Sequence, residues 1–494
     1  MEKNLFATAL KNESAWTLTE NGAVAKNTTG DKCLDFFATV GALRGQDQAR
    51  IERLFADAYN EDPLTATRTL FYTRDVRGGL GERATFRTIL RYAADHHPEC
   101  VIPNIEYIGY YGRFDDLYSL IGTKCEDEMW RYMKGLFTSD LSHMKYDEPC
   151  SLLAKWIKTP DASSPRTAEL GCLTAKKLGY SVYRFKRLLR QLRRYIDVTE
   201  VKMSAKRWGE ISYSAVPSRA MKNYRKAFFK HDEERFKEFL NKVETGEEKI
   251  NASTLFPYDL VEAYWNSTWG WGFRDVHEDR TIEAQWKALP SYVESGTNAI
   301  VIADTSGSMQ GRPLNSALSL AVYFAERNSG PYHNLFMSFS NQSTIHELKG
   351  ETLLQKLKSI NMNDWGGSTN LKAAFDQILD IAVRNHIPQE EMVKSIIVIS
   401  DMEIDYCGCE NWTFYDRMRD RYATKGYEIP NVIFWNVESR HDTFHADKER
   451  KGVQLVSGQS AATFKNLMNS IGLTPVELMM KVLSDERYSF IKVA

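Results

Sequence analysis

A short apolar run that ends on a carboxylate constrains this chain more than any other feature. Ala299 to Ala303 is uniformly apolar, as in a strand buried on both faces of a parallel sheet. Asp304 follows directly, and hydroxyls come at alternate positions, Ser306 and Ser308, before a helix that begins near Arg312. Because open α/β sheets bind ligands beyond the carboxyl ends of their strands, this segment predicts an oxygen-lined site at a sheet edge.

Taken alone, the Asp-x-Ser-x-Ser pattern has two interpretations. Ser, Gly and Asp are common turn formers, so the segment could be a plain strand-to-helix turn with an N-cap. Alternatively, its carboxylate and hydroxyl oxygens are hard donors. With no His or Cys nearby, such donors favour Mg²⁺, with Mn²⁺ or Ca²⁺ as alternatives.

Two later segments place more oxygen donors at strand or helix ends. Gly366 to Asn370 precedes a helical stretch and includes the hydroxyl of Thr369. Val393 to Asp401 is a second apolar strand that ends on a carboxylate. The three segments, in this order, favour the metal interpretation over the plain turn.

The pattern resembles the metal-ion-dependent adhesion site of the von Willebrand factor A domain family. The resemblance implies a doubly wound α/β domain in which five side chains surround one divalent cation: Asp304, Ser306, Ser308, Thr369 and Asp401. It also implies water-mediated contacts and a sixth position for an acidic group of a partner, a carboxylate or, on charge grounds, a phosphate. Glu403 and Asp405 would make the rim more negative, which weighs against phosphate.

Length and composition bound the rest of the chain. Its 494 residues predict two or more domains, and its 43% hydrophobic and 26% charged residues are typical of soluble globular proteins. The net charge of −1 means that polyanion binding requires a local patch. No apolar run approaches the roughly 20 residues of a membrane span. The first residues lack a secretory signal, and seven scattered cysteines suggest a reducing compartment, so we expect a cytoplasmic protein without membrane contact.

Hydrophobic periodicity predicts four parts. Residues 1–30 read as a polar N-terminal arm, and 31–290 as an α-helical module of the HEAT-repeat type. Residues 297–472 alternate strands and helices, as in a doubly wound domain. Residues 473–494 form a C-terminal helix and a tail, whose end we expect to return to the first domain. The fold class is therefore α plus α/β.

Basic residues gather in two places. Between residues 181 and 230 cations greatly outnumber acids and alternate with aromatic residues, which favours a polyanion-binding strip over a solvated face balanced by distant acids. Glycine-rich residues 71–83 contain three arginines that could bind phosphates, or that Asp75 and Glu82 could hold in a structural loop. The candidate RNA-binding residues are Arg74, Arg77, Arg83, Lys186, Arg187, Arg190, Arg193, Arg194, Lys202, Lys206 and Arg207.

A helical module followed by a von Willebrand A domain resembles the Ro autoantigen family, in which the helical module is called TROVE. More closely, the chain resembles a domain-of-unknown-function family of Ro-like proteins from cellular genomes and viruses. The matching stretches include residues 28–37, 74–83, 151–156, 216–220 and 304–308. The resemblance implies a ring that closes on the A domain, and binding of small structured or single-stranded RNA.

We therefore weigh three functions. The first is a non-catalytic, Ro-like RNA-binding protein, and the second is a metal-dependent protein–protein adhesion module without RNA. An RNA-processing enzyme is third, because no Ser has a marked His partner and the ten histidines make no HExxH. Cys407 and Cys409 could be a redox or soft-metal pair, although a plain loop is the simpler interpretation.

Overall fold

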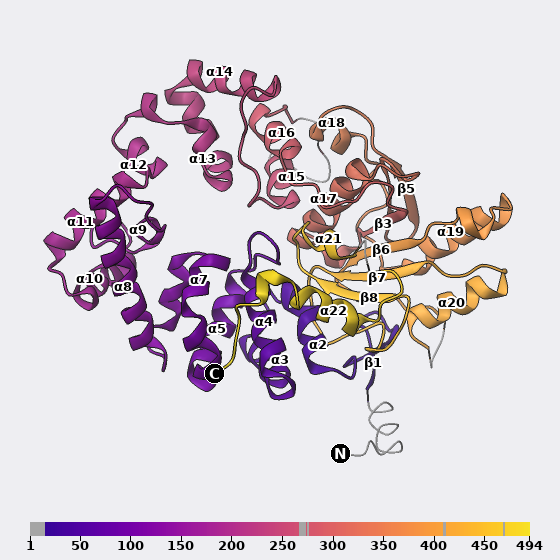
Figure 1. Ribbon diagram of the computed structural model, residues 1–494. Coiled ribbons are helices and arrows are strands. Elements are labelled where there is room, and N and C mark those ends of the chain that lie inside the picture. The colour runs from indigo at the N-terminus through magenta and orange to yellow at the C-terminus, as the bar shows by residue number, and fades with distance from the viewer. Residues whose placement is uncertain (1–14, 266–272, 274–275, 409–411, 468–469) are drawn as a thin grey trace.

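The chain builds an α-helical region followed by a domain with a six-stranded sheet (Figure 1). The computed structural model describes residues 15–265, 273, 276–408, 412–467 and 470–494. Among these residues, no helix has both the length and the apolar character that a bilayer-spanning segment needs.

Short amphipathic helices make up the first region, and their ends follow local sequence signals. Asp31, Asp47 and Asp62 cap three of the helices through their carboxylates, and Pro63 occupies the first turn after Asp62. The helices are α2 (Lys32–Thr39), α3 (Gln48–Glu61), α4 (Pro63–Arg74), α5 (Ala84–His96), α6 (Pro98–Val101), α7 (Ile105–Tyr111), α8 (Glu126–Lys145), α9 (Leu153–Trp156), α10 (Pro165–Leu178), α11 (Val182–Tyr195), α12 (Thr199–Ser204), α13 (Ser218–His231), α14 (Glu233–Glu244), α15 (Pro257–Trp265) and α16 (Arg280–Lys287).

The second region is the doubly wound domain that the sequence predicts. Its strands are β3 (Ala299–Asp304), β4 (Leu335–Phe339), β5 (Ser343–Glu347), β6 (Ser395–Ser400), β7 (Asn431–Asn436) and β8 (Val453–Ser457). They lie in the order β5-β4-β3-β6-β7-β8, and only β5, at one edge, is antiparallel to its neighbour. The helices are α17 (Arg312–Arg327), α18 (Leu353–Lys358), α19 (Leu371–Arg384), α20 (Phe414–Thr424), α21 (Thr463–Leu467) and α22 (Pro475–Leu483).

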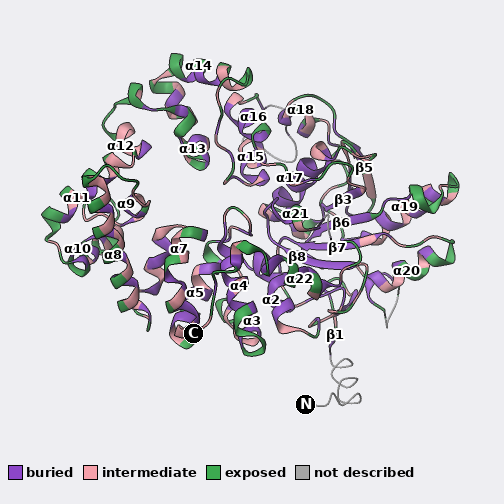
Figure 2. Cartoon of the chain, in the orientation of Figure 1, coloured by how far each residue is buried: buried purple, intermediate pink, exposed green. Residues whose placement is uncertain are grey.

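Helices cover both faces of this sheet. Alternate residues of β3 belong to different hydrophobic clusters: Val301 packs with α17, whereas Ile302 packs with α19 and α20. Figure 2 shows β3, β6, β7 and β8 buried along nearly their whole length, while α11 and α14 carry exposed residues on their outer sides; the edge strand β5 is mostly half-buried or exposed. The near-continuous apolar strands are thus explained by burial on two faces.

The helical region contacts the sheet domain at both of its ends. At the first end, the 3₁₀ turn Val40–Ala42 lies against β8, where the Gly41 amide donates to Ser457 Oγ (3.0 Å). At the other end, Trp286 Nε1 donates to Glu326 Oε2 of α17 (2.7 Å). Between these ends the helices run round in an arc, from α2 through α8 to α11 and back through α13 to α16 (Figure 1).

The two ends of the chain also cross between the regions. Residues 16–18 and 24–26 form a hairpin, β1 (Trp16–Leu18) and β2 (Val24–Lys26), which meets the sheet domain through the bridges Gly22–Asp405 and Lys26–Phe444. The described part of the expected polar arm is therefore a packed hairpin. The C-terminal tail returns to the first region, as expected, with Tyr488 Oη donating to Asp75 Oδ2 (2.9 Å).

The contact at Gly41 yields a stability prediction. A Cβ added there would lie 2.7 Å from the backbone of Gly458, so Gly41→Ala should destabilise the protein by about 1–3 kcal/mol through overpacking. Gly135→Ala in α8 is the matched control, because its Cβ would meet no atom within 4 Å and alanine is the better helix former. Urea unfolding midpoints should fall for the first variant and stay or rise for the second. Equal midpoints would contradict the packing described.

Candidate functional site

The parallel pairing of β3 with β6 brings two carboxylates to one edge of the sheet. Ala303 is in register with Ile399, which places Asp304 beside Ser400, so Asp401 follows at the same carboxyl edge, one residue further along. The loop after β3 is joined to the loop before α19, because the Gly307 amide donates to the Gly367 carbonyl (2.9 Å). All three sequence segments therefore meet where the sequence predicts.

The oxygen donors after β3 contact one another, and most of the five predicted donors are buried. Asp304 Oδ1 accepts from the Ser306 amide (2.9 Å), and Ser306 Oγ lies 3.2 Å from Ser308 Oγ. Asp304 Oδ2 accepts from Ser400 Oγ (2.6 Å), a contact that the sequence pattern did not indicate. Asp304, Ser306, Thr369 and Asp401 are each at most 1% exposed, whereas Ser308 is half-buried at the mouth.

The pKa of Asp304 is raised because its carboxyl group is buried beside a second carboxylate. Burial, and then the charge of Asp401, raise the pKa of Asp304 to about 7. Among the described residues, no cationic side chain forms an ion pair with Asp304. A buried carboxylate beside hydroxyl oxygens and a second carboxylate is a donor set that suits Mg²⁺, so the residues present fit a divalent cation.

Sequence reasoning missed the residue that pairs with the second carboxylate. Arg440 Nη2 lies 2.9 Å from Asp401 Oδ2 and 2.9 Å from Glu20 Oε2. Arg440 follows β7, the strand next to β6, and only the strand order reveals that it reaches the same edge.

The turn between β1 and β2 lies against the site. Asn21 Nδ2 donates to Thr369 Oγ1 (3.2 Å) and to the Glu403 carbonyl (2.6 Å), and the Asn21 carbonyl accepts from the Tyr406 amide (3.0 Å). A segment nearly 350 residues away in sequence thus contacts one of the predicted metal donors. In the same loop Cys407 is buried, and Cys409 lies outside the described residues, so a pairing of the two stays a hypothesis.

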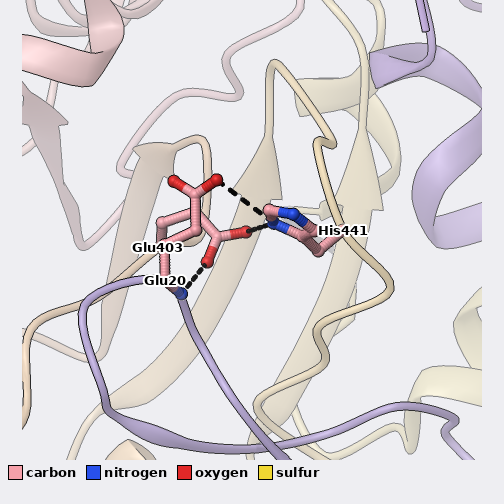
Figure 3. Close-up of side chains that lie close together, drawn as sticks. All are labelled: Glu20, Glu403 and His441. Atoms are coloured by element: carbon pink, nitrogen blue, oxygen red, sulfur yellow. Dashed lines mark hydrogen bonds and ion pairs between the residues drawn. The ribbon is translucent and has the colours of Figure 1, made fainter.

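Glu20 and Glu403 also converge on an imidazole beside the site. Figure 3 shows both carboxylates directed toward the ring of His441. His441 Nδ1 lies 3.1 Å from Glu403 Oε1 and 3.5 Å from Glu20 Oε1, and the Glu20 amide donates to Glu403 Oε2 (2.7 Å). Of the two extra acids of the rim, Glu403 is therefore buried against His441, whereas Asp405 is half-buried and accepts from the Thr369 amide (3.1 Å).

Helix α11 presents an exposed basic stripe. Arg187, Arg190 and Arg194 share one face with Tyr183, whose side chain is 80% exposed, while Phe185, Leu189 and Leu192 fill the core behind them. None of the three arginines pairs with an acid in the part of the chain that the structure describes. We call Tyr183, Arg187, Arg190 and Arg194 the α11 stripe.

The other basic candidates are placed differently. Arg77, Arg83 and Lys206 are exposed. Three further cations pair with neighbouring acids: Lys186 with Asp161, Lys202 with Asp197, and Arg207 with Glu210. Arg194, Lys202 and Arg207 line one open pocket of about 470 Å³.

The structure contradicts two of the candidate RNA contacts. Arg74 is 2% exposed and its Nε donates to Asp116 Oδ2 (2.7 Å), so it is a buried structural ion pair. Arg193 donates to the carbonyls of Ala154 and Ile157 (2.8 Å each), which attaches α11 to the segment of α9. Both corrections have the same cause. The guanidinium donates its hydrogen bonds to acceptors within the protein, so it is not available to a phosphate.

Residues 71–83 form a structural loop, but its two acids pair with arginines outside the loop rather than with the loop's own arginines. Asp75 pairs with Arg487 of the C-terminal tail, and Glu82 accepts from Arg44 Nη2 (2.7 Å). Both acids are buried, so these pairs attach the loop to Arg44 and to the C-terminal tail.

The charge excess predicts how Asp304→Asn behaves without metal. In EDTA the amide should stabilise the protein by about 1–3 kcal/mol, because it removes a buried charge without a cationic partner. The pKa of Asp304 is about 7 in the folded protein and about 4 in the unfolded chain, so the wild type loses stability as the pH rises between these values. The stability difference between Asp304→Asn and the wild type should therefore be largest above pH 7. Thermal unfolding of the wild type and of Asp304→Asn in EDTA, at pH 5 and at pH 8, measures this difference in stability.

Asp364→Asn, at an exposed position, removes the same charge and is the control for that experiment. A lower unfolding temperature for Asp304→Asn at pH 8 would show that the Asp304 carboxylate is stabilised in the metal-free protein.

Comparisons with known proteins agree with this division of the chain. A family model described as "Domain of unknown function (DUF7788)" matches residues 298–488, the sheet domain. A second, "Domain of unknown function (DUF2828)", matches residues 19–137 and 138–297. The chain is also similar to "Uncharacterized protein L728" of Acanthamoeba polyphaga mimivirus, at 27% identity over 507 residues, covering 94% of this chain and 87% of the viral protein. Since the second model matches more than half of the chain, this protein belongs to the DUF2828 family.

Proposed function

We propose that this protein is a non-catalytic, Ro-like RNA-binding protein. Its helical region would bind small structured or single-stranded RNA. Its sheet domain would be a von Willebrand factor A domain that holds Mg²⁺, or Mn²⁺ or Ca²⁺ in its place.

The α11 stripe is the observation that supports RNA binding most. Three arginines without acidic partners among the described residues follow one helix face, and an exposed tyrosine stands at its start. Arginine forks bind phosphate oxygens, and an exposed ring stacks on any base. A chain with a net charge of −1 has no general affinity for polyanions, so this local concentration of cations is what would attract RNA.

A second basic hollow adds to this support. An open pocket of about 380 Å³ is lined by Arg87, Arg91, Lys158 and Arg166, together with Asp115. Beside it, burial and the neighbouring charges of Arg113 and Arg87 lower the pKa of Arg83. Arg87 and Lys158 already pair with Asp115 (3.1 and 3.5 Å), so Arg91 and Arg166 are the cations of this hollow without an acidic partner among the described residues, and they are the ones that a phosphate group would meet.

The architecture is compatible with a Ro-like ring. The helical region contacts the sheet domain at both ends, whereas an open arc would touch it at one. The strand order, with one antiparallel edge strand and helices on both faces, is compatible with a von Willebrand A domain.

In the proposed metal site, Asp304, Ser306, Ser308, Thr369 and Asp401 would hold the cation. When bound, it would neutralise the carboxylates and offer a coordination position to an acidic group. Arg440 keeps Asp401 oriented through the contact at 2.9 Å, and Ser400 does the same for Asp304.

A second candidate function is a metal-dependent adhesion module that grips an acidic protein group. One observation favours it: the acidic turn of the β1–β2 hairpin already lies against the site, with Glu20 held by Arg440. The rim therefore accommodates a carboxylate from another segment. Under this hypothesis the metal site, rather than α11, is the binding surface.

We expect the triple variant in which Arg187, Arg190 and Arg194 are each replaced by Glu to bind RNA at least about tenfold more weakly at 0.1 M salt. The slope of the logarithm of its binding constant against the logarithm of the salt concentration should be smaller by about 2. The control reverses three exposed lysines of the sheet domain, Lys349, Lys425 and Lys451, which gives the same net charge. Fluorescence anisotropy with a hairpin RNA and a single-stranded oligonucleotide measures both quantities. Equal losses in the two variants, or no salt-dependent binding by the wild type, would rule out the proposal.

Mg²⁺ should raise the unfolding temperature of the wild type and leave that of Asp304→Asn unchanged. At a free concentration about 100 times Kd the stabilisation would be about 2.7 kcal/mol. The same variant separates the two functions, since RNA affinity should persist in it, whereas a Mg²⁺-dependent protein partner should be lost. A wild type insensitive to Mg²⁺, Mn²⁺ and Ca²⁺ would remove the metal site from the proposal.

A further inference from the structure

We infer that Glu20, Glu403 and His441 form a second cation site, of the imidazole–carboxylate type that takes Zn²⁺. The site would fasten the β1–β2 turn to the carboxyl edge of the sheet. It uses none of the five donors of the first site and depends on neither RNA binding nor Mg²⁺.

The geometry of the three side chains supports this. Ligand atoms at about 2.0–2.1 Å from zinc lie about 3.3–3.4 Å apart in tetrahedral coordination. His441 Nδ1 lies 3.1 Å from Glu403 Oε1 and 3.5 Å from Glu20 Oε1, on either side of that value. A cation could replace the proton between these atoms with small movements of the side chains, and the three side chains leave a fourth position for water.

The contacts of each ligand to its surroundings suit a preorganised site. Glu403 is fully buried, and its other oxygen, Oε2, accepts from the Glu20 amide (2.7 Å), which holds the carboxylate in place. Glu20 Oε2 is held by Arg440 (2.9 Å), which leaves Oε1 directed at the imidazole. Such outer contacts orient metal ligands and raise their affinity.

The negative charge around this edge exceeds what one dication would neutralise. Six carboxyl groups lie on or beside the loops after β3, β6 and β7: those of Glu20, Asp304, Asp401, Glu403, Asp405 and Glu438. In the part of the chain that the structure describes, Arg440 is the only arginine or lysine that forms an ion pair with any of them. A dication in the first site would still leave an excess of negative charge. Buried carboxylates are stable when paired or metal-bound, so this excess independently favours a second dication.

An imidazole sets this site apart from the first in its choice of metal. The first site offers only hard oxygen donors, which suit Mg²⁺, whereas one nitrogen with two carboxylates suits Zn²⁺ and its spectroscopic substitute Co²⁺. Zinc would join a residue of the N-terminal hairpin to two loops of the sheet domain, and so hold the turn over Thr369.

Titration of the full-length, EDTA-stripped protein with Co²⁺, in excess Mg²⁺, tests this site. The wild type should bind one equivalent of Co²⁺ with a visible absorption band, and Zn²⁺ should displace it. His441→Gln and Glu20→Gln should each raise the Kd at least about tenfold, the loss that even an outer-shell partner causes. Their side chains are 52% and 41% exposed, so both variants should fold.

Two controls make the result specific. His143→Gln removes a partly exposed histidine that faces one carboxylate, Glu148, and should leave Co²⁺ binding unchanged. Asp304→Asn should abolish the effect of Mg²⁺ yet retain Co²⁺ binding, which separates the failure of one site from that of the other. A wild type that binds no Co²⁺ or Zn²⁺, or a His441→Gln variant that binds as tightly, would show instead that the three residues form only a hydrogen-bonded ion pair.

Discussion

The candidate site depends on the parallel pairing of β3 with β6. In-register parallel strands end at the same edge, so the carboxylates of Asp304 and Asp401 are forced into proximity by backbone hydrogen bonds. Burial then removes the water that would screen them, and the pKa of Asp304 rises as a result. The fold therefore places two carboxyl groups close together in its interior, of which only Asp401 has a cationic partner among the described residues.

The edge where these strands end is also where distant parts of the chain converge. The β1–β2 turn lies against Thr369, and Arg440 from the loop after β7 reaches Asp401. Away from this edge, the tail returns to Asp75 in the first region. These contacts, together with those at Gly41 and Trp286, make the helical region and the sheet domain parts of one packed structure. A ligand at the sheet edge would thus act on the attachment of the N-terminal hairpin.

Local pattern was sufficient for the elements of the second domain. The expected strand from Ala299 and the expected strand ending before Asp401 are β3 and β6, and each predicted helix between them exists. Apolar runs and caps are local in sequence, so they can be recognised without knowing what packs against them. Which arginines are available to a ligand could not be recognised this way. Arg74 and Arg193 look like Arg190 in the sequence, yet only Arg190 is exposed.

By itself, the sequence determined the two-part architecture and the order of strands and helices of the sheet domain, because these follow from short-range periodicity and residue type. It also suggested five oxygen donors, through a family resemblance. The tertiary structure alone decided the surroundings of those donors. Arg440, His441 and Glu20 arrive from a neighbouring strand and from the opposite end of the chain, which no local pattern can specify. It also decided which cations face solvent, since an arginine is directed inward or outward by the acceptors that folding brings within reach.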